Sequence, residues 1–164
     1  MARKVFFSFH YERDAWRAGQ VRNSNITQAI KGYLDAAEWE EVKRKGDKAI
    51  SGWIDEQLKG TSVTVVLIGK ETSNRKWVNY EIEKSIEKGN GLLGIYIHRL
   101  KNQDGEKDTK GDNPLDNYYI TVDGKQKKAS TVFNTYYWAL DKGNENFSDW
   151  IEEAADIAGR YPNY

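Results

Sequence analysis

The sequence predicts an α/β domain in which a mostly parallel sheet is covered by helices on both faces. Two observations predict this fold class. Apolar, β-prone runs place strands near residues 4–9, 62–69, 92–98 and 131–137. Amphipathic segments with recognisable helix caps lie between or after these runs. Strands that alternate with helices are joined by crossover connections, which give parallel pairing.

The N-terminal part begins with a clear strand and then becomes ambiguous. Residues 4–9 (KVFFSF) are strongly β-prone, whereas residues 10–25 are polar and aromatic without a clean period. Ser24 or Asn25 offers an N-cap for a short helix with the apolar residues Ile26, Ile30 and Leu34. Residues 37–47 (AEWEEVKRKGD) fit either a short edge strand or a loop.

The middle of the chain gives the strongest predictions. Asp47 can cap a helix that ends at Gly60 and whose apolar face comprises Ile50, Trp53, Ile54 and Leu58. Residues 61–69 (TSVTVVLIG) are apolar on both faces, which predicts a central strand. Ser73 or Asn74 then starts a second helix that carries Val78, Ile82 and Ile86 at helical spacing and ends at Gly89.

The C-terminal part repeats the alternation with a long loop inside it. A buried-type strand at 91–100 is followed by a polar, charged loop at 101–113, which Pro114 closes. A final strand is predicted at 131–138. Ser148 is the expected cap of the last helix. The loop is most simply solvated and mobile, and a role as a lid is the alternative.

Composition narrows the function classes. The 164 residues correspond to one domain, 1–164, and the balance of 25 basic and 25 acidic residues argues against nucleic-acid and membrane-surface binding. The chain has no Cys and two His, so we expect no disulfide, no thiol catalysis and no metal site. It opens without an apolar signal core and has no run of 18 apolar residues. We therefore expect a soluble, cytoplasmic protein.

The common nucleotide and hydrolase motifs are missing. The chain has no G-x-x-x-x-G-K-[ST] phosphate loop, no G-x-G-x-x-G after the first strand and no G-x-S-x-G elbow. In open α/β sheets, ligands bind beyond the carboxyl ends of the strands, where the strand order reverses. Candidate residues are therefore sought in the segments that follow the first strand and the central strand.

Two short segments meet this condition. Ser8, Phe9, His10 and Tyr11 close the first strand, and Trp77 and Glu81 lie in the helix after the central strand. Trp77 and Glu81 are four residues apart, which puts the indole and the carboxylate on one face of the helix. We expect this face to be rotated away from the apolar stripe at 78, 82 and 86. We expect all six residues to border one cavity.

Each of these residues also has a simpler interpretation. Glu81 fits one of many solvated glutamates on a Lys/Glu-rich helix, with Trp77 packing at its edge. His10 fits a hydrogen-bonded loop residue, and His98, inside an apolar strand, is most simply structural.

These residues resemble the Toll/interleukin-1 receptor (TIR) superfamily. The strand VFFSF resembles its first-strand signature, and Trp77-Val78-Asn79-Tyr80-Glu81 resembles the W-x-x-x-E that carries the catalytic glutamate of NAD-consuming members. The chain is most similar to the bacterial TIR-like family typified by ThsB of the Thoeris antiphage system. The stretches that carry this resemblance are KVFFSFHYERD with VRNSN, WEEVKRKGDKAISGWIDEQLKGTSVTVVLIG, RKWVNYEIEKSIEKGNGLLGIYIH, GDNPLD and YYWALDKGNENFSDWIEEAA.

The resemblance implies a flavodoxin-like, five-stranded sheet and a role in antiphage signalling. Such a protein converts NAD, as substrate and not as cofactor, into a cyclic ADP-ribose-type messenger that activates a separate effector. Glu81 would be the catalytic residue, and Ser8, Phe9, His10, Tyr11 and Trp77 would bind substrate. The region between the first strand and Asp47 departs from animal and plant TIR domains, so residues 12–46 are assigned no substrate contact. The alternative is a non-enzymatic TIR-like module that acts by self-association or by docking to a partner.

Overall fold

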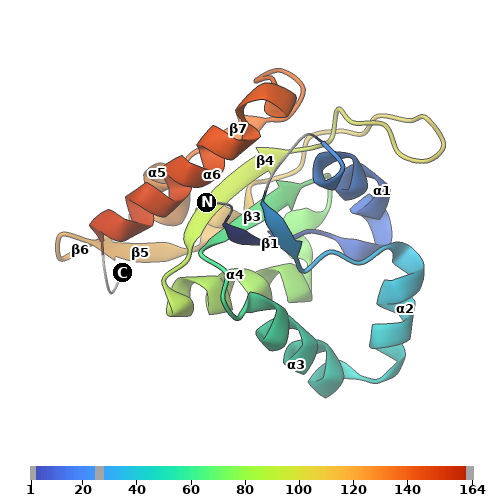
Figure 1. Cartoon of the computed structure of the whole chain (residues 1–164), viewed down its shortest axis with the longest axis horizontal. Helices are drawn as coiled ribbons and strands as arrows, with labels where there is room; N and C mark the ends of the chain where they lie inside the picture. Colours follow the sequence, from blue (N-terminus) through green and yellow to red (C-terminus); the bar gives the residue numbers. More distant parts are fainter. Residues whose placement is uncertain (1–2, 25–27, 162–164) are drawn as a thin grey trace.

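A five-stranded, fully parallel sheet forms the centre of the protein (Figure 1). The computed structural model describes residues 3–24 and 28–161. The strands are β1 (Lys4–Ser8), β2 (Ala29–Lys31), β3 (Val63–Ile68), β4 (Gly91–Tyr96) and β7 (Thr135–Tyr137). Their order, β2-β1-β3-β4-β7, is that of a flavodoxin-like sheet and confirms the predicted fold class.

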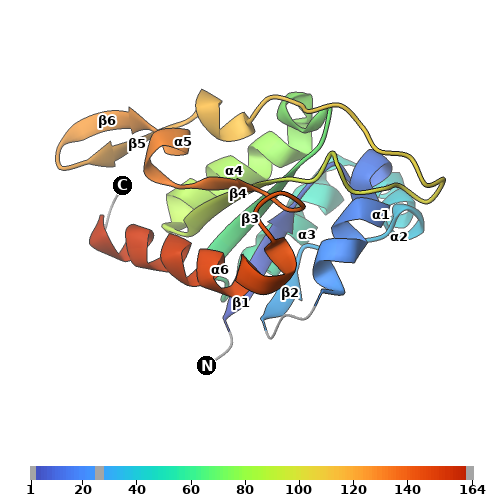
Figure 2. The ribbon, with the colours of Figure 1, turned by 90° about the horizontal axis from the view of Figure 1, so that it is seen from above.

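Helices cover both faces of this sheet. The helices are α1 (Tyr11–Arg22), α2 (Ala36–Arg44), α3 (Asp47–Leu58), α4 (Lys76–Lys88), α5 (Ala129–Val132) and α6 (Gly143–Arg160). Two short 3-10 helices, η1 (Thr72–Asn74) and η2 (Pro114–Asn117), lie in the connections. Helices α4 and α6 lie on opposite sides of the strands (Figure 2). No helix in the described part of the chain is long and apolar enough to cross a membrane.

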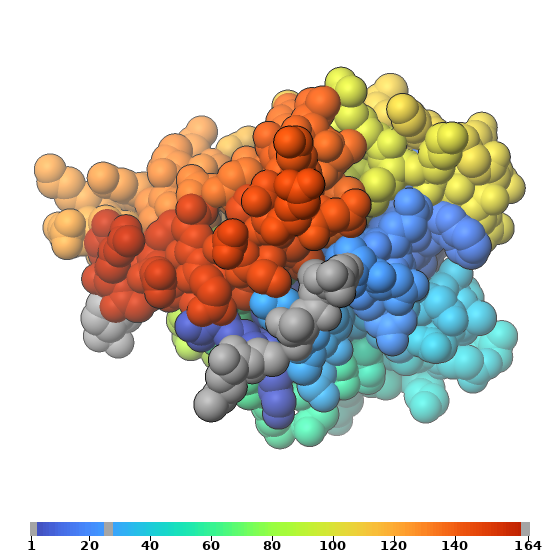
Figure 3. Space-filling view, turned by 45° about the horizontal axis from the view of Figure 1, so that its top comes forward, coloured from blue at the N-terminus to red at the C-terminus, as the bar shows by residue number. Residues whose placement is uncertain are grey.

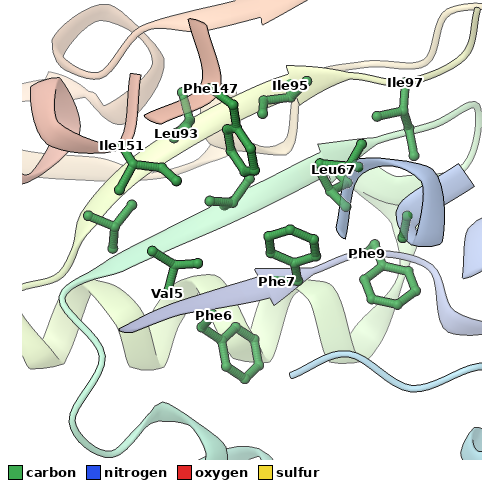
Figure 4. Packing of buried hydrophobic residues seen from close by; sticks show 14 of the residues in the cluster. Val5, Phe6, Phe7, Phe9, Leu67, Leu93, Ile95, Ile97, Phe147 and Ile151 are labelled. Carbon is green, nitrogen blue, oxygen red and sulfur yellow. The ribbon is translucent and has the colours of Figure 1, made fainter. Parts of the chain in front are cut away.

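Alternation along β1 directs its side chains to two different layers. The ring of Phe7 lies 6.2 Å from that of Phe147 on α6, inside the main apolar core (Figure 4). Successive residues of a strand point to opposite faces, so Ser8 faces the other layer. There its hydroxyl meets Glu81 of α4. The strand period thus places the hydroxyl of Ser8 against α4, at the end of a strand whose other buried residues are apolar.

The segment after β1 differs from the prediction. Residues 10–25 were assigned no element, but α1 occupies most of them, with His10 as its N-cap. Buried Asp14 and Arg17 interrupt its apolar stripe, which hides the helical period. The predicted helix through Ile30 and Leu34 is wrong, because Ile30 lies in β2 and pairs with Val5 of β1. The other proposed members, Asn25 and Ile26, lie outside the described residues.

Two helix assignments need further correction. Residues 37–44 lie in α2 and form neither a strand nor a loop; this helix begins with a capping box made by Asp35 and Glu38. Trp39 is its only buried residue, so the apolar face is too narrow to be seen in the sequence. The last helix, α6, begins at Gly143 and not at Ser148; the polar residues 144–146 come before its first apolar side chain, Phe147, and hide its start in the sequence.

The region before the last strand contains an unpredicted hairpin. Strands β5 (Tyr119–Val122) and β6 (Lys125–Lys128) pair antiparallel beside the main sheet, and α5 follows directly. Ile120 and Val122 are buried, whereas all four residues of β6 are exposed. The final strand of the main sheet was predicted in the right place but is shorter than expected.

The predicted loop at 101–113 is a loop, but α1 anchors it. Arg17 donates hydrogen bonds to the carbonyl oxygens of Leu100 and Glu106, at 2.8 and 3.0 Å. The same guanidinium donates to Asp14 at 3.0 Å, and both side chains are almost completely buried. A buried ion pair therefore fixes the first half of a loop that the sequence describes as solvated and mobile.

Candidate active site

Glu81 lies at the reversal point of the strand order, completely shielded from solvent. It belongs to the second turn of α4, which follows β3, and its exposed fraction is 0%. The prediction that its face is rotated away from the apolar stripe is wrong. Val78, Glu81, Ile82 and Ser85 together form the buried face of α4. Glu81 is thus the carboxylate within an otherwise nearly apolar helix face.

Two hydroxyl groups from the β1–α1 junction hold this carboxyl group. Ser8 Oγ, at the end of β1, donates to Glu81 Oε1 at 2.7 Å. Tyr11 Oη, at the start of α1, lies 2.7 Å from Glu81 Oε2. The structure therefore brings together three of the six predicted site residues. Glu81 is about seventy positions away in the sequence from its two partners, Ser8 and Tyr11.

The hydrogen bonds around Tyr11 indicate where the proton of this cluster resides. Tyr11 Oη also lies 2.9 Å from the carbonyl oxygen of Gly32, yet a tyrosine hydroxyl has one proton to donate. Both contacts are satisfied when Glu81 is protonated, because Glu81 then donates to Tyr11 and Tyr11 donates to Gly32. An ionised Glu81 would accept the one hydrogen bond that Tyr11 can donate, which would leave the Gly32 carbonyl oxygen without a donor from Tyr11.

The electrostatics of the site agree with a protonated Glu81. Burial raises the pKa of Glu81 to about 8, and the hydrogen bonds that Ser8 and Tyr11 can donate to the ionised carboxylate only partly oppose this rise. The same burial, together with the neighbouring Glu81, raises the pKa of the Tyr11 hydroxyl well above its ordinary value. At neutral pH the resting cluster is therefore a neutral acid held by two neutral hydroxyl groups.

The predicted common cavity exists only in part. Phe9, His10, Tyr11 and Trp77 do line one cavity, whose volume is about 10 Å³. Ser8 and Glu81 do not border it. A space of this size holds about one water molecule. A substrate can therefore reach the carboxyl group only if the side chains around it move.

Tyr11 is the side chain that covers Glu81. Its ring packs against Phe9 at 4.5 Å, against Trp39 of α2 at 4.6 Å and against Trp53 of α3 at 6.1 Å. Such aromatic contacts stabilise a closed arrangement beyond the area that they bury. The cover over Glu81 is thus an aromatic cluster contributed by three helices and by Phe9, which follows β1.

Trp77 lies at the edge of the site and is half-buried. Its ring contacts Tyr80 edge-on at 5.5 Å, and the ammonium of Lys76 lies 4.8 Å from its ring centre. Tyr80 in turn donates a hydrogen bond to Asp55 of α3 at 2.8 Å. Trp77 lines the small cavity while Glu81, one turn later, points into the protein.

His10 serves the backbone of α1. Its Nδ1 accepts a hydrogen bond from the Arg13 amide at 3.3 Å, which caps the helix. Burial and the positive charge of Arg75 lower its pKa to about 4, so the imidazole is neutral at pH 7. This is the hydrogen-bonded role that the simpler interpretation predicts, at a position that still borders the cavity.

Glu12 is a residue of this site that the sequence analysis missed. Its Oε1 accepts hydrogen bonds from Trp39 and Lys43 of α2, each at 3.3 Å, and from Arg75 at 3.4 Å. It thereby ties α1 to α2 and to the segment before α4, beside the aromatic cover. No pattern identifies such a role, because its partners come from separate parts of the chain.

The remaining buried polar groups lie outside this cluster. Asp14 Oδ2 and His98 Nδ1 have no hydrogen-bond partner among the described residues, and burial raises the pKa of Asp14. His98 packs edge-on against Tyr96 and Tyr137 just after β4, in keeping with a structural role. Within residues 3–24 and 28–161, no group of three or more acidic, His or Cys side chains is arranged to hold a metal ion.

Comparison with known proteins gives two matches. A family model described as "Thoeris protein ThsB, TIR-like domain" matches residues 6–102. The chain is also 38% identical, over 191 aligned positions, to a protein of Bacillus cereus (strain MSX-D12) named "Putative cyclic ADP-D-ribose synthase ThsB1". That alignment covers 92% of this chain and 100% of the relative. The family match includes the end of β1, all of α1 and all of α4, and therefore Ser8, Tyr11 and Glu81.

Proposed function

Because the chain belongs to the TIR-like family of Thoeris ThsB proteins, we propose that it cleaves NAD and cyclises the ADP-ribose product into a messenger. One observation carries the assignment of the site. A single carboxyl group, that of Glu81, is held by two hydroxyl groups where the strand order reverses, within a W-x-x-x-E sequence. The name of the Bacillus cereus relative, a cyclic ADP-D-ribose synthase, supports the same reaction.

The chemistry needs one carboxylate and a shielded site. The bond between the ribose anomeric carbon and the nicotinamide nitrogen breaks, and its electron pair leaves with nicotinamide, which becomes neutral. Positive charge then develops on the sugar, and a nearby ionised Glu81 stabilises it and holds the ribose hydroxyls. An atom of the same ADP-ribose forms the new bond and loses its proton. Because this nucleophile is part of the substrate, folding the substrate matters more than activating water.

The resting arrangement also gives this enzyme a means of staying inactive. Glu81 is covered by Tyr11 and is a neutral acid at neutral pH. Opening the aromatic cover would admit the substrate and hydrate the carboxyl group, which lowers its pKa and favours the ionised form. Access to the site and formation of the reactive carboxylate are thereby coupled. Aromatic rings at Phe9, Tyr11 and Trp77 would then face the substrate.

The wider role follows from the family. The messenger would activate a separate effector protein in the cytoplasm, where NAD is available, and self-association of this chain would be a further step. The competing function is a binding module without catalysis. The closed state of Glu81 is the observation that favours it, since an unused carboxyl group could remain buried.

The test compares two glutamates of the same helix. NAD is incubated with the purified protein and with extract of infected cells, and nicotinamide and ADP-ribose-like products are separated by chromatography. Glu81→Gln should reduce product at least about 100-fold, as loss of a key electrostatic group does. Glu83→Gln should leave it near normal, because Glu83 is exposed on α4. A Glu81→Gln protein that still makes the messenger would contradict the assignment and favour the binding module.

A further inference from the structure

We propose, on the basis of the function above, that a second cavity binds the adenine base of NAD. This cavity of about 510 Å³ lies between α1, the segment 33–37 and the loop at 102–104. These three parts of the chain meet on one side of the molecule (Figure 3). Its volume falls in the range of small-molecule sites, about 300–1,000 Å³. The cavity beside Trp77, at about 10 Å³, leaves no room for a dinucleotide.

The walls of this cavity suit a flat ring. Trp16 is 57% exposed, although a large ring of this kind is usually packed inside a protein. Tyr33 also lines the cavity, but Phe9 stacks on its ring at 5.9 Å and the guanidinium of Arg22 lies 4.7 Å from its ring centre, so Trp16 is the lining ring available for stacking. The methyl groups of Ala15, Ala36 and Ala37 lie among the polar lining residues. Aromatic side chains with free faces bind nucleobases by stacking.

The charges select the base rather than the diphosphate. Three lining residues are acidic: Glu12, Asp35 and Asp104. The one cationic lining residue, Arg13, is already paired with Glu71 at 3.0 Å and with Asp108. Phosphate groups would be repelled here, whereas carboxylate oxygens can accept hydrogen bonds from the exocyclic amino group of adenine.

Amide side chains complete the recognition of a base edge. Gln103 lines the cavity, and its side chain makes no hydrogen bond to any residue in the described part of the chain. The Asn102 side-chain oxygen holds its own loop through the amides of Asp104 and Glu106, which leaves its amino group free to donate. An amide can pair with adenine through one donated and one accepted hydrogen bond.

The two cavities are adjacent because they share a lining residue. Glu12 borders both the adenine cavity and the small cavity beside Trp77. Arg75 contacts Glu12 at this boundary, at 3.4 Å, and is the cation available to the diphosphate that links the two halves of NAD. The nicotinamide half must reach Glu81 to react, so the base in the second cavity is adenine.

The test follows the Trp16 indole N–H signal by NMR while ligand is added. AMP and nicotinamide mononucleotide are the two probes, since each carries one ribose and one phosphate and they differ in the base. Trp16→Phe identifies the signal among those of the six tryptophans. AMP should shift it saturably and nicotinamide mononucleotide should not. An unmoved signal with AMP, or an equal shift with nicotinamide mononucleotide, would overturn the proposal.

Variants separate this proposal from the proposed function. Trp16→Ala should weaken AMP binding at least tenfold, whereas Tyr119→Ala, which removes an aromatic ring that is 55% exposed elsewhere, should leave binding unchanged. Glu81→Gln should bind AMP like the unmodified protein, because the titration requires no turnover. AMP binding without NAD cleavage would refute the enzyme function alone, and NAD cleavage without AMP binding at Trp16 would refute the adenine site alone.

Discussion

Replacing Glu81 by Gln should stabilise the folded protein increasingly as the pH rises. A glutamine side chain reproduces the protonated carboxyl group: its oxygen accepts from Ser8, and its amino group donates to Tyr11, which remains bonded to Gly32. Glutamine cannot ionise. The variant therefore keeps the hydrogen bonds of the resting site without the need to hold a proton there.

The magnitude follows from the pKa of Glu81. Burial raises this pKa from 4.5 to about 8, so the folded state retains a proton that the unfolded state has released. The stability that this proton contributes is fully present below pH 4.5 and is lost as the pH rises towards 8. Each pH unit in this window weakens folding by about 1.4 kcal/mol, which amounts to about 3 kcal/mol at pH 7.

Urea unfolding at several pH values between about 5 and 8 measures this difference directly. The two proteins should have similar free energies of unfolding near pH 5, and the free energy of unfolding of the variant should be greater by about 4 kcal/mol near pH 8. Other titrating groups are common to both proteins and cancel in the comparison. Glu83→Gln is the control and should show no pH-dependent gain, because Glu83 is exposed. A difference that is constant across this range would refute the buried proton.

Three other substitutions test features around the site. His10→Ala should lower the free energy of unfolding by about 1 kcal/mol, because the cap of α1 is lost. His10→Asn should retain most of the stability that the cap contributes, because Asn can also cap a helix. Equal losses of stability for the two variants in urea unfolding would count against the capping role. Arg17→Met should lower the free energy of unfolding by about 3–5 kcal/mol, because Asp14 is left buried without its partner. Amide hydrogen exchange should also accelerate near residues 100–106. Unchanged exchange there would show that Arg17 does not anchor the loop. Gly91→Ala should cost about 1–3 kcal/mol in thermal or urea unfolding, because its methyl group would lie 2.4 Å from the Ala154 carbonyl oxygen of α6. The control Gly52→Ala meets no atom within 4 Å and should raise stability by about 1 kcal/mol, and a destabilised control would contradict this account.

The sequence predicted those elements whose burial is simple. Strands β1, β3 and β4 are buried along almost their whole length, and α4 has a regular apolar stripe, so each is visible as a periodic pattern. Helix α1 was missed because it buries an ion pair, and α2 because one tryptophan supplies its buried surface. Both are held by contacts with other helices that a local pattern does not contain.

The candidate site was predicted to a similar extent. The position after the first and central strands correctly brought Ser8, Tyr11 and Glu81 together. The orientation of Glu81 was wrong, although Val78, Glu81, Ile82 and Ser85 have the spacing of a single helix face. A charged residue is normally assigned to the solvent side, and only its two hydroxyl partners, from another part of the chain, make its burial tolerable.

The outer strands of the main sheet restrict how this protein can join a second copy. Both β2 and β7 contain three residues, so each free edge offers a neighbouring strand only a few backbone hydrogen bonds. Nearby β6, also an edge, carries exposed Lys125, Lys127 and Lys128, whose like charges repel an identical strand. Extension of the sheet from one molecule to the next is therefore disfavoured at the edges of β2, β7 and β6. We expect an assembly of this protein to use side chains on its helices and loops, where single substitutions can weaken it without disturbing the sheet.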